Sequence, residues 1–237
     1  YTHEQDEIAA EFYARALAVE PNYHDAKWNY SQAIGRLYCS NKYFKPDILW
    51  NCMDARFNKS SPVKLKNKKK LISWNFKDKV PSIVVLVEQG FGDHLQFGRY
   101  LSILEQYADK IWVQCSPRAN VFYTKYLTCN DPIETDAEYG VPICSLAKIC
   151  DYIPSGDWLK EKYVRKPPSK TLDIGVTWSG NSAHGNNHYR SSKPGYFRIL
   201  SKYGNLYTLN PTEVNTFGFT DLDSSGWDAT IRELSKL

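Results

Sequence analysis

The sequence lacks features that would each place it in a distinct class of protein. No apolar run approaches the ~18 residues that a membrane-spanning helix needs, so we expect no membrane span. No strong excess of one charge is present, because the formal net charge is only +4 over 237 residues, which by itself does not indicate a nucleic-acid partner. The composition is that of a globular protein, with 42% hydrophobic and 24% charged residues, enough for one large domain or two small ones.

The spacing of the cysteines matches no metal-binding or redox motif. None of them forms a CxxC pair, and no His lies at zinc-finger spacing from them. Most sit beside apolar neighbours, which is typical of small core residues in a reduced, cytoplasmic protein. The chain begins at Tyr1 rather than Met, so we expect that the true N-terminus precedes it, where a signal stays an open alternative. The cysteines are Cys39, Cys52, Cys115, Cys129, Cys144 and Cys150.

Three helices are predicted in the first quarter of the chain. Apolar residues recur at helical spacing in Ile8–Glu20, His24–Tyr38 and Pro46–Phe57, and Pro21 stops the first of these. The stretch YARALAVEPNYHDAKWN resembles the junction between two tetratricopeptide repeats, each of which needs neighbours to bury its faces. The alternative is a generic helical hairpin. The segment that follows, 59–78, carries a basic run that favours a solvated connection over a phosphate-binding role: Lys64, Lys66, Lys68, Lys69 and Lys70.

Strands and helices alternate from Ile83 onward. Such alternation predicts an α/β fold with parallel sheets and crossover helices. Pro167-Pro168-Ser169 is the candidate hinge between two units of this kind. The expected strands are Ile83–Val87, Ile111–Cys115, Ile174–Trp178 and Leu206–Leu209, and the expected helices are Asp93–Tyr107, Ala119–Leu127, Tyr196–Tyr203 and Trp227–Leu237.

The first motif with chemical content is VEQGFGDHLQFGRY, Val87–Tyr100. A buried strand runs through Gly90 and Gly92 into a helix, whose N-terminus favours an anion or a polar sugar. Asp93 has two readings, as the N-cap of that helix or as a general base. The segment is not a dinucleotide fingerprint, because Leu95 stands where a third glycine would fall.

The second motif is DIGVTWSGNSAHGNNHYRSS, Asp173–Ser192. Many donors follow one buried strand, which suits a phosphate-bearing ligand at the carboxyl edge of a parallel sheet, and Arg190 can contact a diphosphate with two hydrogen bonds. The alternative is an ordinary solvated loop. We expect no metal at His184 and His188, because the loop offers no third clustered ligand.

Together the motifs resemble the tetratricopeptide-linked glycosyltransferases related to glycosyltransferase family nine, the heptosyltransferase-like group. In that group a Trp and an Arg-containing helix lead into an EQGxGDxxQFxRY segment. A Cys-x-Leu-Ser-Leu-like stretch and a WxGNxxHxNDRxRS loop follow. The resemblance spans nearly the whole chain, and the residues that carry it are Trp50, Arg56, Glu88, Gln89, Gly90, Gly92, Asp93, Gln96, Phe97, Arg99, Tyr100, Cys144, Ser145, Leu146, Trp178, Gly180, Asn181, His184, Asn186, Arg190 and Ser191.

The resemblance implies a GT-B enzyme that transfers a sugar from a nucleotide-sugar donor to an acceptor hydroxyl, without a metal or other cofactor. The acceptor would be a glycan, lipid or protein. It implies a tetratricopeptide-like segment over 1–58, an acceptor-side Rossmann-like domain over 79–168 and the start of a nucleotide-sugar-side domain over 169–237. Asp93 would be the catalytic base. The substrate-binding residues would be Gln89, Gly90, Gly92, Gln96, Trp178, Gly180, Asn181, His184, Asn186, Arg190 and Ser191.

The chain departs from the pattern in two places. Asn187 and His188 replace an Asp and an Arg, which puts the identity of the donor in doubt. The family also continues past a helix like Trp227–Leu237 with a further strand and an Asp-Thr pair, so we expect a fragment or a truncated protein. A catalytically incomplete binding or structural module, with a protein partner on the helical repeat, is therefore the second hypothesis. Nucleic-acid binding by Lys64–Lys70 is a third and weaker one.

Overall fold

The computed structural model of the chain is an α/β protein with two parallel sheets. It describes residues 3–38, 46–65, 69–88, 90–155, 171–180, 182, 187–210, 218–223, 225 and 227–234. The chain divides into two compact units, Tyr1–Trp158 and Leu159–Leu237. The proposed hinge Pro167-Pro168-Ser169 lies outside the described residues.

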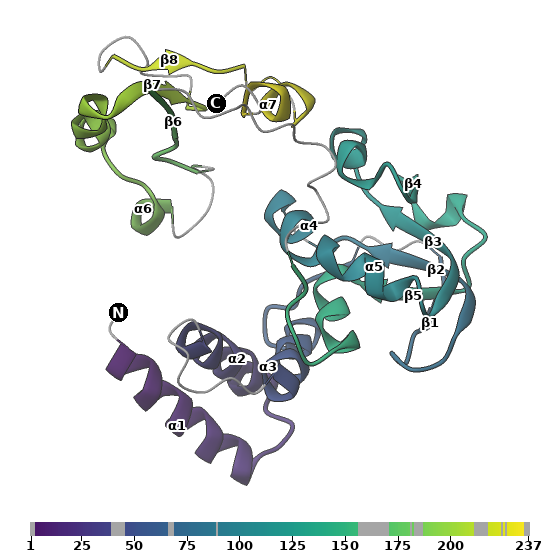
Figure 1. The fold of residues 1–237 in the computed structure, drawn as a ribbon. Helices are drawn as coiled ribbons and strands as arrows, with labels where there is room; N and C mark the ends of the chain where they lie inside the picture. Colours follow the sequence, from purple (N-terminus) through teal and green to yellow (C-terminus); the bar gives the residue numbers. More distant parts are fainter. Residues whose placement is uncertain are drawn as a thin grey trace. The chain divides into compact units, whose positions relative to one another are not determined.

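The first unit begins with helices that lie side by side (Figure 1). They are α1 (His3–Val19), α2 (His24–Tyr38) and α3 (Pro46–Met53), and α3 continues as the 3₁₀ turn η1 (Asp54–Phe57). The sequence prediction of three helices is confirmed. The buried face of α2 contains small side chains such as Ala26 and Ala33, which allow close packing between neighbouring helices. Membership of these helices in a tetratricopeptide array stays a prediction.

The first sheet is parallel throughout. Its strands are β1 (Ile72–Ser73), β2 (Val80–Leu86), β3 (Ala108–Gln114), β4 (Leu127–Cys129) and β5 (Tyr139–Pro142), in the order β1-β5-β2-β3-β4. The central strand β2 is the most hydrophobic, because its side chains meet protein on both faces of the sheet. The strand order reverses between β3 and β5, on the two sides of β2. Ligands of open parallel sheets bind at the carboxyl ends of the strands where such a reversal occurs.

The connections in this unit are shorter and more broken than the sequence pattern predicts. The helix expected over Asp93–Tyr107 is α4 (Phe91–Phe97), the 3₁₀ turn η2 (Gly98–Tyr100) and α5 (Leu101–Leu104), with the break at Gly98, a poor helix former. The helix expected over Ala119–Leu127 is the 3₁₀ segment η3 (Pro117–Tyr123), and Leu127 begins β4. Two further 3₁₀ segments, η4 (Pro132–Glu134) and η5 (Ile143–Ile149), precede and follow β5.

The second unit is built on a smaller parallel sheet. Strands β6 (Leu172–Val176), β7 (Gly204–Thr208) and β8 (Thr220–Asp221) pair in that order. A Cβ at Gly204 would lie 2.0 Å from the backbone oxygen of Leu172, so only glycine allows β6 and β7 to pair in this register. The helical segments are α6 (Asn187–Arg190), η7 (Pro194–Lys202) and α7 (Trp227–Leu234).

The described cysteines are free thiols: Cys52, Cys115, Cys129, Cys144 and Cys150. Cys115, Cys129 and Cys144 are buried, as expected for small core residues, and burial raises the pKa of Cys115 and of Cys129 to about 11. Within the described ranges, no helix has both the length and the apolarity to cross a membrane.

Candidate functional site

The candidate site lies at the carboxyl end of β2, beside the reversal of strand order. Gly90 is the N-cap of α4, which begins at Phe91, two residues before the expected start at Asp93, so Phe91 and Gly92 belong to the helix and not to a turn before it. A Cβ added to Gly90 or to Gly92 would meet no atom within 4 Å. The two glycines therefore leave the approach to the start of α4 open. Gln89, which the sequence analysis placed in this site, lies outside the described residues.

Asp93 is the third residue of α4 and not its N-cap, which corrects the capping interpretation. Its backbone N–H donates to the Gly90 oxygen at 3.0 Å, and its half-buried carboxylate accepts a hydrogen bond from the Gly90 backbone N–H. Burial raises the pKa of Asp93, and the nearby Glu88 carboxylate raises it further, against the opposing effects of Gly90 and Arg56. The result is a carboxylate with a higher proton affinity than an exposed aspartate.

A buried ion pair lies next to Asp93. The guanidinium of Arg56 donates to both carboxylate oxygens of Glu88, from Nε at 2.5 Å and from Nη2 at 2.7 Å. The Arg56 side chain is 2% exposed and that of Glu88 0%. Two parallel charge-assisted hydrogen bonds of this kind fix direction as well as distance. The pair therefore ties η1 of the helical segment to the end of β2.

The remaining polar atoms of this pair are also satisfied. Arg56 Nη1 donates to Asp54 at 2.7 Å, Arg56 Nη2 to the Ser145 hydroxyl at 2.9 Å, and the Cys144 backbone N–H to Glu88 at 3.1 Å. Asp54 also forms an ion pair with Lys148. These hydrogen bonds and ion pairs hold the pKa of Asp54 below its usual value despite its burial. We call this set the Arg56 network: Asp54, Arg56, Glu88, Ser145 and Lys148.

His94 anchors α4 from the opposite side. Its Nδ1 lies 2.6 Å from the Tyr123 hydroxyl, and burial lowers the pKa of His94 to about 4. The imidazole is therefore neutral at physiological pH, and its tautomer decides which of the two groups donates in this hydrogen bond. Because Tyr123 belongs to η3, this bond fixes α4 against the loop that follows β3.

A cavity of about 730 Å³ borders the other face of α4. Gly92 and Gln96, two of the expected substrate-binding residues, lie in its wall. The cavity is large enough for a small-molecule ligand. Its wall consists of Ser31, Gln32, Gly35, Arg36, Tyr38, Leu49, Trp50, Met53, Gly92, Leu95, Gln96, Phe97, Arg99, Tyr100 and Ile153. We call it the α4 cavity.

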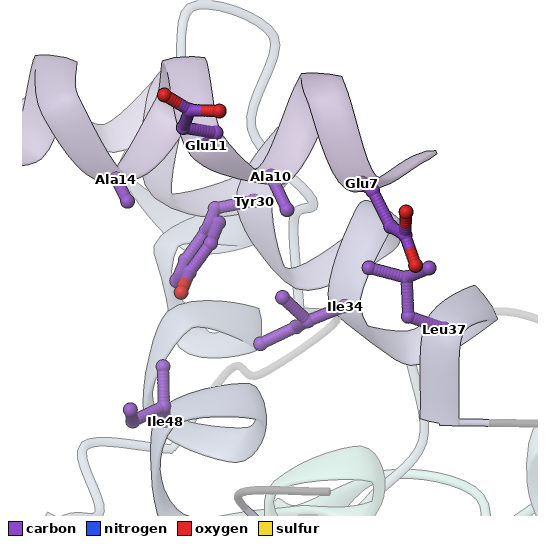
Figure 2. A pocket seen from close by; sticks show the side chains of 8 residues that line it. All are labelled: Glu7, Ala10, Glu11, Ala14, Tyr30, Ile34, Leu37 and Ile48. Carbon is purple, nitrogen blue, oxygen red and sulfur yellow. The ribbon is translucent and has the colours of Figure 1, made fainter. Parts of the chain in front are cut away.

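A second hollow, of about 350 Å³, lies among the first helices. Figure 2 shows Tyr30 and Ile34 of α2 between the small side chains of α1 and Ile48 of α3. Its walls are mainly apolar, and its charged residues are the carboxylates Glu7 and Glu11 of α1. We call it the α1 hollow. Its described lining comes from the first helices and not from a sheet edge. The α1 hollow therefore suits binding of an apolar or cationic partner better than it suits catalysis.

In the second unit, Asn210 shapes the loop that follows β6. Its Oδ1 accepts from the Trp178 backbone N–H and the Thr177 hydroxyl, both at 2.8 Å, and its Nδ2 donates to the Ser179 oxygen at 3.2 Å. Asn210 follows β7, so one amide side chain joins the carboxyl ends of two neighbouring strands. Sequence reasoning missed this residue. The polar position directly after a predicted strand was the signal that pointed to it.

The structure brings several of the expected donor-binding residues of this unit together. A Cβ on Gly180 would lie 3.5 Å from Asn187 Oδ1 and 3.7 Å from Arg190 Nη2, and the Ser191 hydroxyl donates to Asn187 at 3.1 Å. The Arg190 side chain is exposed. Trp178 is buried instead, with its ring 5.2 Å from that of Phe219. Asn181, His184 and Asn186 lie outside the described residues.

Among the described side chains, no group of three His, Cys, Asp or Glu residues is arranged to hold a metal ion. In the basic segment, Lys64 and Lys70 are exposed, and Lys69 donates to the Thr135 backbone oxygen at 2.8 Å. Lys66 and Lys68 lie outside the described residues.

Comparisons of the chain with protein-family models, with curated proteins and with solved structures find no match.

Proposed function

We propose that the chain belongs to a metal-independent glycosyltransferase of the GT-B type, in which Asp93 activates an acceptor hydroxyl. The observation that carries the proposal is the position of Asp93. It is a half-buried carboxylate of raised pKa, on the helix that follows the central strand where strand order reverses. A raised pKa makes a carboxylate a better proton acceptor near neutral pH.

The proposed reaction is a single displacement of the diphosphate by the acceptor. The acceptor oxygen bonds to the anomeric carbon of the donor sugar while its proton passes to Asp93. The bond between that carbon and the diphosphate oxygen breaks, and the nucleoside diphosphate leaves with the electron pair. In the second unit, Arg190, with Asn181 and His184, would stabilise the charge that develops on the leaving diphosphate. We place the protein in the cytoplasm and the first helices in a tetratricopeptide-like array.

The test measures release of nucleoside diphosphate from a panel of nucleotide sugars, with glycan, lipid and peptide acceptors. Asn accepts the Gly90 hydrogen bond as Asp does but cannot act as a base, so Asp93→Asn should lower kcat at least ~10²-fold. The matched control is Asp109→Asn, which neutralises an exposed carboxylate of β3. Near-full turnover in Asp93→Asn would remove Asp93 from the mechanism.

A binding module without catalysis is the second candidate, and the α1 hollow is the observation that favours it. An apolar concavity between helices suits a protein partner. A thermal-shift screen separates the two, because a nucleoside diphosphate at a hundred times its dissociation constant stabilises the fold by about 2.7 kcal/mol. A binding module of this kind would show no such shift.

A further inference from the structure

The α4 cavity has a wall of one charge sign. Among the described residues that line it, the charged groups are the guanidinium groups of Arg36 and Arg99, and no carboxylate is present. Arg36 is neutralised by Asp6, with Nη2 and Oδ1 2.6 Å apart. Arg99 has no carboxylate partner among the residues that the structure describes. Within the described part of the chain, its guanidinium makes one hydrogen bond, from Nη1 to the Pro154 backbone oxygen at 3.2 Å, and no ion pair.

Arg99 is also incompletely satisfied by neutral groups. Its Nε is buried, and no hydrogen-bond acceptor among the described residues reaches it. A half-buried cation without a counter-ion costs free energy that folding does not recover. An anion entering the cavity would recover part of that cost, because it would supply the charge and the acceptors that the wall lacks.

The rest of the wall suits a hydroxylated ligand. Trp50 is half-buried and meets Phe97 edge to face, with ring centroids 6.3 Å apart. Amide groups of Gln32 and Gln96 and the hydroxyl of Ser31 lie in the same wall. An aromatic face with nearby amides and hydroxyls matches the alternating C–H and O–H surfaces of a sugar ring. The Ser31 hydroxyl already donates to the Trp28 backbone oxygen at 2.7 Å and accepts from the Gln32 amide at 3.4 Å, whereas the Gln96 side chain is exposed. A purely apolar ligand would cover the Gln96 amide without replacing its hydrogen bonds to water.

We propose that the α4 cavity binds an acidic sugar, whose carboxylate or phosphate pairs with Arg99 while its ring lies against Trp50. The assignment of this sugar as the acceptor rests on the proposed function. Gly92 lines the cavity and Asp93 is the next residue of α4. Arg99 is seven residues beyond Gly92, five of them along α4 and two along η2, or ~12 Å. An acceptor longer than one sugar ring therefore spans this wall and ends beside Asp93.

The test is direct binding without any donor. Saturation-transfer NMR titrations would compare glucuronate, glucose 6-phosphate and glucose on the full chain. Both anions should bind at least tenfold more tightly than glucose, which corresponds to about 1.4 kcal/mol. The relative affinity of the two anions tells whether a carboxylate or a phosphate is the natural group. Equal binding of glucose and the anions would overturn the inference.

Substitutions at Arg99 and Gln96 test where in the α4 cavity the anionic group of the sugar binds. Arg99→Gln should abolish the tenfold preference, whereas the control Arg118→Gln, at an exposed arginine of η3, should keep it. Gln96→Glu changes an exposed side chain of the same wall and adds one negative charge, so it should also abolish the preference even if Arg99→Gln fails to fold. Gln96→Lys should strengthen anion binding. An unchanged preference in Gln96→Glu and Gln96→Lys would contradict the proposed site.

The two proposals fail separately. If the anions bind through Arg99 but no nucleotide sugar is consumed with any acceptor, the cavity is a sugar-acid site and the proposed transferase is wrong. If a sugar is transferred to an acceptor whose affinity ignores Arg99, the transferase stands and the acidic-sugar site is wrong.

Discussion

Arg56 and Arg99 lie in the same unit, and each has buried guanidinium nitrogen atoms, but among the described residues only Arg56 has a carboxylate partner. Arg56 is surrounded by acceptors on every side, including both oxygens of Glu88. Arg99 has one backbone acceptor and a buried Nε without a partner. A buried cation that is fully paired serves the fold, because its charge is already balanced. A cation that the fold leaves unbalanced is available to a ligand.

The comparison is tested most strongly by Arg56→Met, which removes one side of a buried ion pair. Glu88 would remain buried without a counter-charge, so we expect a loss of about 3–5 kcal/mol in the free energy of unfolding. Urea denaturation measures it. The double variant Arg56→Met/Glu88→Gln should recover a large part of the loss. A double variant as unstable as Arg56→Met alone would mean that packing, and not charge, gives Arg56 its importance.

His94 extends the comparison to a buried group that stays neutral. Its pKa of about 4 lies below the ordinary value of 6.5, so the unfolded chain binds the extra proton more readily between these values. Stability is then fully present above about pH 6.5 and falls as the pH drops toward 4, by at most about 3 kcal/mol. Unfolding measured across this range would show it. His94→Gln should flatten the dependence, and an unaltered slope would assign it to other groups.

Arg190 is a third case, an exposed guanidinium beside Gly180 and Asn187. If it contacts the diphosphate, Arg190→Ala should weaken binding of a nucleoside diphosphate by roughly 1.5–3 kcal/mol, the range for hydrogen bonds to charged groups. Calorimetric titration gives the number. Arg198→Ala, at an exposed position of η7, is the control, and equal affinities in both variants would exclude Arg190 as a ligand contact.

The smallest expected effect is that of Arg99→Gln on stability. Loss of the packed aliphatic stem is offset by removal of an unbalanced charge, so the free energy of unfolding should change by no more than about 1 kcal/mol. Urea denaturation beside Arg56→Met would measure the contrast. A loss as large as that of Arg56→Met would show that Arg99 is structural, and the comparison of the two arginines would fail.

The first three helices were predictable from sequence because each carries a periodic pattern, and His24–Tyr38 agrees with the structure at both ends. The helices expected over Ala119–Leu127 and Tyr196–Tyr203 are 3₁₀ segments instead. The strands β1, β4, β5 and β8 were missed, since two to four residues give no period to detect. Asp93 was assigned a possible capping role because the sequence pattern began the helix at Asp93, two residues after its actual start at Phe91. Glycine at position 90, with no side chain to cap, serves as the N-cap.

The contacts within the Arg56 network could not be predicted from the sequence pattern. Arg56, Glu88 and Ser145 were singled out separately by the family resemblance, but their mutual contacts span separations of 32 and 89 residues. Arg99 was likewise recognised from the sequence only as one residue of a motif. Its unpaired state depends on which acceptors the fold fails to bring near it, and that follows only from the three-dimensional arrangement.

The Arg56 network also decides how the first unit comes apart. If the helical side that carries Arg56 moves away while the sheet stays folded, Glu88 loses its counter-charge and remains buried away from water. Fraying of α3 and η1 therefore leaves the Glu88 carboxylate without its counter-charge at the carboxyl end of β2, and the backbone amides of both regions should exchange with deuterium as one cooperative block. A shortened chain that starts after Phe57 would carry that defect permanently, so the first helices are part of the folding unit rather than a detachable accessory.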